Sequence, residues 1–299
     1  HVAPRRHVRA LGPALAVQVV SGSVPGVGAT ALLRSLLVKG PTLVKPGRGD
    51  LVLPLLAARA VAAAHPVLAR SLAVVYWPGG REEAERAALS AADVVVAYGG
   101  DAAVARLRAR SPATARFVGY HHRVGVGAVG RRALERERAA GTAREVARAA
   151  AVFDQRGCVS PQVVWVEEGG AESPRSFARR VAEAFAELEG RLPGGRLDPE
   201  EASALHQLRG TEELRAAAGA GVEVRHGGAA TWTVVWDPDP SFAPTCVGRV
   251  LRIKPLSDLM RLPELLEPVA RHLQTVGLAG AGARRAEVAE AVARAGASR

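Results

Sequence analysis

ALAVQVVSGSVPGVGATALLRSLLVKGPTLVKPGRGD, residues 14–50, predicts the fold of the first half of this chain. Its opening run, ALAVQVVSG (14–22), is almost continuously apolar and ends in glycine, as does a strand that is buried on both faces. VGATALLRSLLVKG (27–40) then places apolar residues at helical spacing and stops at a glycine. A short strand, PTLVKPG (41–47), follows and is broken by proline. The order strand, helix, strand indicates a parallel βαβ unit.

The same alternation continues up to residue 120. A second helix is expected over 49–65, and further strands and helices over 72–80, 81–91, 93–100, 101–110 and 115–120. Short apolar strands separated by helices predict an α/β fold with a doubly wound parallel sheet. Such sheets bind ligands at the carboxyl ends of their strands. Those ends are rich in glycine or charge and read SGSVPG, KPGRGD, WPGG, YGGD and GYHHR.

The second half begins with a long expected helix, residues 131–151, which a cysteine-containing stretch follows. Beyond it we expect a strand, two helices, three strands and then helical residues from 256 onward. The sequence therefore suggests a nucleotide-binding domain over 1–150, an α/β catalytic thiol domain over 151–275, and a truncated helical segment over 276–299.

Composition excludes several classes of protein. Of the 299 residues 48% are apolar, enough for a sizeable core, yet no window reaches the ~18 consecutive apolar residues of a membrane span. The net charge is +11, but the arginines alternate with glutamates, only three residues are lysine and 4% are aromatic, which argues against nucleic-acid binding. The charge still suits an anionic ligand such as a nucleotide or coenzyme A. The start, HVAPRRH, lacks a methionine and is expected to be trimmed.

Only two cysteines occur, and they lie 88 positions apart without a CxxC motif or a Cys/His cluster. This spacing predicts neither a metal site nor a disulfide framework, and it suits a reducing cytoplasm. Cys158 stands between Gly157 and an apolar run, among polar neighbours that include Arg156, which favours a thiolate. The alternative is an inert buried thiol. Cys246, within TCVGRVLRI, is expected in a core strand.

Three other motifs have two readings each. Gly22 opens GSVPGVGAT (22–30), a strand-to-helix junction that is either a phosphate site or a tight turn; it is no P-loop, because Ala29 replaces the lysine. Lys45 ends a strand in an arginine-rich chain, and Arg48 lies three residues later. Either these two cations bind the ribose and the 2′-phosphate of a nucleotide, or they are simply solvated. His121 and His122 either transfer protons during a reaction or have only a structural role.

The chain strongly resembles the LuxC-type acyl-CoA reductases, the fatty-acid reductases of bacterial luminescence and their relatives, a branch of the aldehyde dehydrogenase superfamily. The resemblance runs over nearly the whole chain, and its motifs are, in order, SGSVPGVGATALLRSLLVKGPTLVKPGRGD, VVYWPGG, ADVVVAYGGD, FVGYHHRVGVG and VFDQRGCVSPQVVWVE. DQRGCVSPQ is the most specific of them. The resemblance implies an aldehyde dehydrogenase-like fold, and both ends look cut.

Carried over residue by residue, the resemblance makes Cys158 the acyl-accepting nucleophile. Lys45 matches the lysine that contacts the cofactor ribose, and Gly99 and Gly100 match the turn that meets the pyrophosphate. Ser23 stands where the superfamily usually has an asparagine whose amide stabilises the oxyanion, and loss of such a donor costs ~3 kcal/mol.

The implied reaction has two halves. Cys158 takes a long-chain acyl group from coenzyme A or another thioester, and NADPH then reduces the bound acyl group to an aldehyde. The superfamily's general-base glutamate has no counterpart in FVGYHHR, which suits a reductase, and His121 or His122 supplies the proton. Metal is not implied.

Two alternatives stay open. One is another NAD(P)-dependent aldehyde dehydrogenase that acts on an acyl phosphate or a carrier-bound acyl group; the other is a degenerate, non-catalytic relative that binds a partner. The expected partners are acyl-CoA or an acyl-protein thioester, acyl-transferring subunits, and further copies of the chain in a homo-oligomer when full length.

Overall fold

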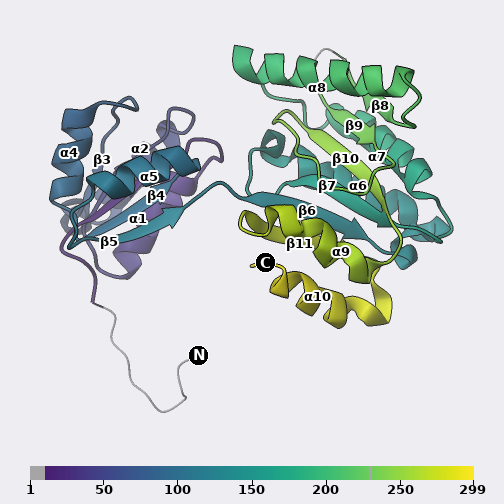
Figure 1. Ribbon diagram of the computed structural model, residues 1–299. Helices are drawn as coiled ribbons and strands as arrows, with labels where there is room; N and C mark the ends of the chain where they lie inside the picture. Colours follow the sequence, from purple (N-terminus) through teal and green to yellow (C-terminus); the bar gives the residue numbers. More distant parts are fainter. Residues whose placement is uncertain (1–10, 229–230) are drawn as a thin grey trace. The chain divides into compact units, whose positions relative to one another are not determined.

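The computed structural model describes residues 11–228 and 231–299. The chain separates into two compact units, one ending at His122 and the other beginning at Arg123 (Figure 1). The sequence suggested a boundary at residue 150 instead. The difference arises because β6 (Val124–Val129) pairs with β7 and β11 of the second unit and brings the residues that follow it into that unit.

The first unit is a five-stranded parallel sheet with helices on both faces (Figure 1). The strand order is β3-β2-β1-β4-β5, so the chain winds outward in both directions from β1. The predicted doubly wound sheet is thus confirmed. Its elements are β1 (Ala16–Val19), α1 (Val27–Leu37), β2 (Thr42–Lys45), α2 (Val52–Ala64), α3 (Pro66–Ala69), β3 (Leu72–Val74), α4 (Glu82–Ser90), β4 (Val94–Tyr98), α5 (Asp101–Arg110) and β5 (Arg116–Tyr120).

Each face of this sheet has its own apolar cluster. Val17 and Val95 pack with α4 and α5, whereas Val20 and Val44 pack with α1 and α2. The one polar residue of strand β1, Gln18, is buried and its Nε2 donates to the carbonyl oxygen of Ala31 at 2.9 Å. The amide is satisfied by helix α1, which explains why a polar residue is tolerated inside a buried strand.

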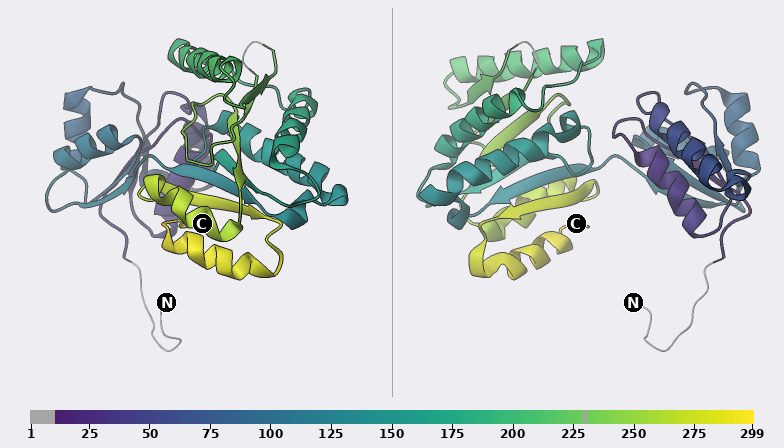
Figure 2. Two further views of the ribbon diagram at one scale, coloured as in Figure 1. Left: turned by 45° about the vertical axis from the view of Figure 1, so that its right-hand side comes forward. Right: turned by 180° about the vertical axis from the view of Figure 1, so that it is seen from behind.

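The second unit is a six-stranded mixed sheet between two helical layers (Figure 2). The order is β11-β6-β7-β10-β9-β8, and only the β8–β9 pair is antiparallel. Helices α6 and α7 cover one face, and α9 and α10 cover the other. Beside β6 its elements are α6 (Arg136–Ala151), β7 (Pro161–Glu167), α7 (Pro174–Glu189), α8 (Pro199–Ala217), β8 (Glu223–His226), β9 (Thr233–Trp236), β10 (Val250–Leu256), α9 (Leu262–Leu266), β11 (Leu273–Ala279) and α10 (Arg285–Arg294).

Three expectations for the second half were wrong. The residues around 273–279 form strand β11 rather than helix, because they pair in parallel with β6. The helix expected over 131–151 is interrupted at Glu135, whose backbone is extended, so α6 begins only at Arg136. Cys246 lies in the loop before β10, which begins at Val250, and is only partly buried.

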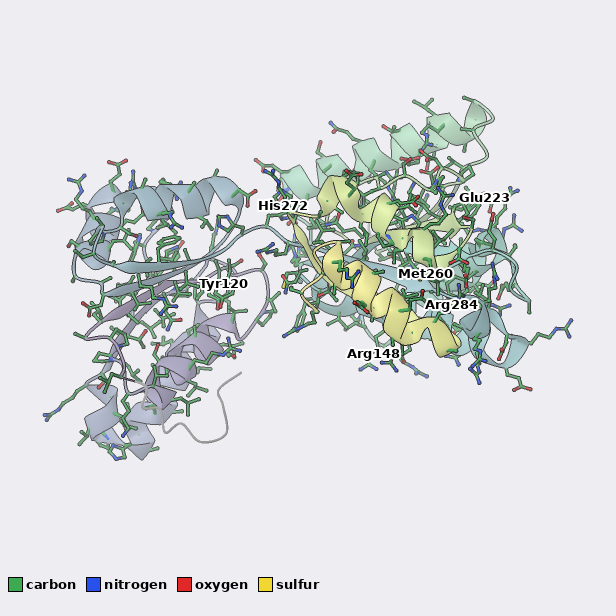
Figure 3. All side chains as sticks on the ribbon, turned by 60° about the horizontal axis from the view of Figure 1, so that its bottom comes forward. Tyr120, Arg148, Glu223, Met260, His272 and Arg284 are labelled. Carbon is green, nitrogen blue, oxygen red and sulfur yellow. The ribbon has the colours of Figure 1, made fainter. Side chains whose placement is uncertain are left out.

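Buried charges link elements of the second unit. Lys254 on β10 and Asp237 after β9 are both almost fully buried, and the Lys254 Nζ lies 2.8 Å from the Asp237 Oδ2. At the carboxyl end of β7 the buried Glu167 accepts two hydrogen bonds of 2.8 Å from Arg284, which Figure 3 shows at the start of α10. These pairs join β9 to β10 and the last helix to the sheet.

A third ion pair predicts how stability depends on pH. Glu223 on β8, labelled in Figure 3, accepts hydrogen bonds from Arg179 and Arg175 of α7, which lower its pKa from 4.5 to about 2. A carboxyl whose pKa is depressed by folding stabilises the folded state above its unfolded pKa, and that contribution is lost as pH falls through the folded value. The advantage of the unaltered chain over Glu223→Gln in thermal unfolding should therefore disappear between pH 4.5 and pH 2.

Melting temperatures measured across that range by circular dichroism check the expectation. Glu264→Gln, which removes a carboxylate from the exposed pair with Arg261, serves as the control, and its difference from the unaltered chain should stay small throughout. Parallel curves for the unaltered chain and Glu223→Gln would contradict the role given to Glu223.

Candidate active site

The carboxyl ends of the strands in the first unit carry most of the predicted site residues. Neighbouring strands β1 and β4 lie where the strand order reverses, which is where open α/β sheets bind ligands. Gly22 and Ser23 follow β1, and Gly99 and Gly100 follow β4. The structure therefore brings these two turns to adjacent strand ends.

The turns after β1 and β2 are in direct backbone contact. A Cβ at Gly22 would lie 2.5 Å from the Gly49 nitrogen, and one at Gly47 would lie 2.2 Å from the Gly22 nitrogen. No residue with a side chain fits at such distances. The buried Asp50 adds a hydrogen bond, since its Oδ2 accepts from the Gly26 nitrogen at 2.9 Å. The turn that carries Ser23 and the loop after Lys45 are thereby fixed to each other.

Ser23 itself is exposed, and its Oγ lies 2.8 Å from the Oγ of Ser21. The Ser23 N–H also donates to that Ser21 oxygen, at 3.2 Å. The hydroxyl is thus oriented by its own turn and accessible to a ligand. Ser21 was not singled out from the sequence, although it stands in the same SGSVPG motif.

Lys45 is the last residue of β2 and is partly buried. Its Nζ lies 5.5 Å from the centre of the Tyr76 ring, a cation–π contact, and burial lowers its pKa. Arg48 is exposed in the loop that follows. Both cations are therefore found at the same sheet edge as the Ser23 turn.

Helix α5 begins at this edge directly after Gly100. Gly100 has an extended backbone and gives no side-chain cap, so the first N–H groups of α5 have no cap from it. A Cβ at Gly100 would meet no heavy atom within 4 Å, which leaves open space beside this turn. N–H groups at a helix start bind phosphate well.

His121 and His122 follow β5, next to β4. The His121 Nδ1 lies 3.4 Å from the Asp101 Oδ1, which also accepts from the His122 N–H at 3.3 Å. His121 therefore has a carboxylate neighbour. The sequence did contain the signal for it, because Asp101 ends the YGGD motif, but its contact with His121 depends on the pairing of β4 with β5.

Cys158 lies in the second unit, in the turn between α6 and β7. The thiol is exposed, as expected for a ligand-accessible junction. The three residues Phe153, Asp154 and Gln155 just before it have φ values of 54°, 52° and 62°. Left-handed backbone is uncommon outside glycine, and three consecutive cases are a clear departure from ordinary geometry.

Arg156, expected to favour a thiolate, has a carboxylate partner that the sequence did not suggest. Its two terminal nitrogens donate to the two carboxylate oxygens of Glu201 in α8, with an Nη2 to Oε2 distance of 2.7 Å. This contact lowers the pKa of Glu201. The guanidinium charge beside Cys158 is thus balanced by Glu201.

The described residues offer neither a metal site nor a membrane-spanning helix. Within residues 11–228 and 231–299, no group of three or more His, Cys, Asp or Glu side chains is arranged to hold a metal ion. Over the same residues, no helix is both long enough and apolar enough to pass through a bilayer.

The fold is that of the aldehyde dehydrogenases. Indole-3-acetaldehyde dehydrogenase AldA of P. syringae superimposes with a TM-score of 0.71 at 15% identity, covering 95% of this chain and 60% of its own. Lactaldehyde dehydrogenase of Escherichia coli gives 0.71 at 16% identity, covering 96% and 61%. An NAD-dependent benzaldehyde dehydrogenase of Corynebacterium glutamicum gives 0.70 at 16% identity, covering 94% and 62%.

Residues 2–299 match the acyl-CoA reductase (LuxC) family, and the chain belongs to that family. The resemblance inferred from the motifs is thereby confirmed. Among curated relatives, long-chain acyl-protein thioester reductase 2 of Photobacterium leiognathi is 26% identical over 280 residues, which is 91% of this chain and 55% of that protein. The long-chain acyl-protein thioester reductase of Aliivibrio fischeri is 26% identical over 263 residues, 86% and 52%. The chain thus spans about half the length of these relatives.

Proposed function

We propose that this chain reduces a long-chain acyl thioester to an aldehyde, with NADPH as the reductant and an acyl group carried on Cys158. The observation that carries the proposal is the exposed Cys158 thiol in the turn before β7, preceded by three left-handed residues, in a chain of the LuxC family. Constrained backbone of this kind clusters at active sites.

In the first half-reaction the Cys158 Sγ attacks the carbonyl carbon of the thioester. The new C–S bond gives a tetrahedral intermediate with an oxyanion. Its collapse restores the C=O bond and breaks the bond to the donor sulfur, and the donor leaves as a thiol that takes up the proton lost by Cys158. Ser23 donates its hydroxyl hydrogen to the oxyanion that develops on the carbonyl oxygen. A hydroxyl offers one such donor, so stabilisation by Ser23 is expected to be weaker than by the usual asparagine.

Three features of the first unit support NADPH as the proposed reductant. The uncapped start of α5, with open space at Gly100, suits the pyrophosphate, Lys45 suits the ribose, and the exposed Arg48 suits a 2′-phosphate. When bound, the nucleotide supplies hydride to the carbonyl carbon of the Cys158 thioester. The resulting hemithioacetal takes a proton, its C–S bond breaks, and the aldehyde leaves with the Cys158 thiol restored. We assign the supply of this proton to His121, whose Nδ1 lies beside the Asp101 carboxylate, or to His122.

Trapping the acyl-enzyme tests the proposal. The purified chain is incubated with radiolabelled long-chain acyl-CoA in the absence of NADPH, separated from free label, and then given NADPH. Label should bind covalently, be released by neutral hydroxylamine as a thioester is, and leave as aldehyde once NADPH is added. The proposal would be overturned if no label bound from acyl-CoA or from an acyl-protein thioester. It would also be overturned if NADPH did not release the bound label.

The same assay separates the acyl donors. The curated relatives are named acyl-protein thioester reductases, which favours a protein-bound acyl group as the natural donor. Acyl-CoA, an acyl-protein thioester and an acyl phosphate at equal concentration should label the chain at different initial rates, and we expect the acyl-protein to be fastest. A chain that binds NADPH but accepts no donor would instead point to a non-catalytic, partner-binding relative.

Arg48→Glu should weaken NADPH binding and leave NADH binding nearly unchanged. Loss of a charge-assisted hydrogen bond to phosphate, with a repulsive carboxylate in its place, should raise the Kd for NADPH by about 10–100-fold. Fluorescence titration with both nucleotides measures the effect. Arg59→Glu, an equal change of charge on the exposed side of α2, is the control and should alter neither Kd. Equal weakening of both nucleotides by Arg48→Glu would contradict the assignment.

Two further expectations remain proposals. A reducing cytoplasm as the location is supported by two free thiols, Cys158 and Cys246. A homo-oligomer is supported by the exposed apolar side chains of Val52, Leu55 and Leu56 on α2, a helix of which only Pro54 is buried.

A further inference from the structure

The side-chain amide of Gln155, three residues before Cys158, is buried and makes three hydrogen bonds. Its Nε2 donates to the carbonyl oxygens of Pro161 at 2.8 Å and Val250 at 2.6 Å, and its Oε1 accepts from the Val250 N–H at 2.7 Å. The reverse orientation would set the Oε1 against two carbonyl oxygens, so the network defines which way the amide points. One side chain thus ties the Cys158 turn to the first residues of both β7 and β10.

The neighbouring Asp154 adds a second tie to the same region. Its Oδ1 accepts from the Nε of the buried Arg249 at 2.8 Å, and its Oδ2 accepts from the Gly195 nitrogen at 3.1 Å. Arg249 also has a left-handed backbone, with a φ of 59°, and it donates to the carbonyl oxygen of Leu192 at 2.8 Å. The turns before β7 and β10 are therefore both unusual in conformation and are linked to each other.

Residues other than glycine leave a left-handed backbone conformation unless contacts with their surroundings hold them in it. Gln155 makes contacts that can hold the turn, because its amide bonds two separate segments. Pro161 follows Cys158 in sequence, and Val250 lies on the adjacent strand. Asp154 bonds Arg249 in the turn before β10 and Gly195 in the loop after α7, and Arg156 bonds helix α8.

We propose that Gln155 is the positioning residue of the Cys158 turn. Its amide holds residues 153–155 in the left-handed conformation, and this places the Cys158 thiol for attack on the acyl carbonyl. The inference rests on the proposed function for its catalytic consequence, while the hold on the turn is a property of the fold. A misplacement of about 1 Å at a reacting group can cost about 100-fold in rate.

Gln155→Glu tests this with almost no change in shape. A glutamate keeps an acceptor for the Val250 N–H but loses both N–H donors and sets a carboxylate oxygen against the carbonyls of Pro161 and Val250. Single-turnover acylation by radiolabelled acyl-CoA should slow by at least about 100-fold. Alkylation by iodoacetamide, which requires only an exposed thiol, should stay within about threefold of the unaltered chain. An unfolded variant would show the same split, so protection of the α7 amides in hydrogen exchange must show that the variant stays folded.

Rates of backbone amide hydrogen exchange report on the conformation of the turn independently of activity. In Gln155→Glu the two carbonyl oxygens should repel the carboxylate and displace it from the Val250 N–H. The amide of Val250 should then exchange at least about tenfold faster, while the amides of α7 keep their protection. Gln155→Met, of similar length and uncharged, should show the same split with a smaller loss of stability. Val181→Ala, a cavity in the buried face of α7, is the matched control: it should lower stability yet leave the acylation rate within about threefold.

Acylation by both Gln155 variants at the rate of the unaltered chain, or unchanged exchange at Val250, would overturn the inference. Equal losses of acylation and alkylation would also overturn it, since they would indicate a thiol that has become inaccessible rather than misplaced. If the unaltered chain takes no label from any donor, the proposed function fails instead, and exchange at Val250 still decides whether Gln155 holds the turn.

Discussion

Cys158→Ala is expected to abolish the covalent acyl-enzyme and to lower the rate of aldehyde formation by at least about 10⁴-fold. The proposed reaction has no route around the thiol, because both half-reactions pass through a bond to its sulfur. The affinity for NADPH should stay the same, since the nucleotide-binding groups proposed here all belong to the first unit. Radiolabel incorporation, aldehyde formation and nucleotide titration measure the three quantities.

Cys246→Ala is the matched control for this change. The Cys246 thiol is partly buried in the loop before β10, and burial raises its pKa, which keeps it protonated and weakly nucleophilic. Its removal should leave labelling and turnover unchanged. Normal labelling of Cys158→Ala would show that Cys158 is not the nucleophile, and loss of labelling in Cys246→Ala alone would assign that role to Cys246. Either result would refute the scheme.

Asp237→Ala should lower the free energy of unfolding by about 3–5 kcal/mol, the cost of leaving one member of a buried ion pair without its partner. Lys254 is only 1% exposed and its Nζ lies 2.8 Å from the Asp237 carboxylate, which also accepts from Arg215 at 3.2 Å. With the carboxylate gone, the ammonium would stay buried against a single remaining acceptor, the carbonyl oxygen of Asp239. Urea denaturation followed by circular dichroism measures the loss.

A second change distinguishes a lost charge partner from lost packing. Adding Lys254→Met to Asp237→Ala removes the unpaired ammonium and should recover part of the stability, whereas a pure cavity effect would not be relieved. Glu264→Ala, in the exposed pair with Arg261, should cost less than about 1 kcal/mol. Equal losses for Asp237→Ala and Glu264→Ala would show that burial of the pair is immaterial.

The first unit could be predicted closely because its signals are local. The runs before Gly22 and Gly99 are apolar, short and bounded by glycine, and the helices between them have regular spacing. The second unit was harder to predict. Strand β6 reads VGVGAV, whose glycines weaken a strand signal, and β11 continues an apolar pattern that resembled a helix. Both are strands because each supplies the other's hydrogen-bonding partner, across more than a hundred residues.

The candidate site divides in the same way. An accessible Cys158 and a cationic strand end at Lys45 followed from adjacent residue types. The contacts that shape the thiol turn did not, because Gln155 bonds Val250 and Arg156 bonds Glu201, residues 95 and 45 positions away. Left-handed backbone at Phe153, Asp154 and Gln155 also has no signature in a sequence that places no glycine there.

The glycine contact between the turns after β1 and β2 bears on how this protein can change. Gly47 and Gly49 are pressed against Gly22, so mutations there should be purged, while Arg48 between them points into solvent and is free to vary. Under the role proposed for Arg48, nucleotide preference can change through one codon without disturbing the turn that carries Ser23. A library that tests the proposed nucleotide preference should therefore randomise position 48 and leave both flanking glycines untouched.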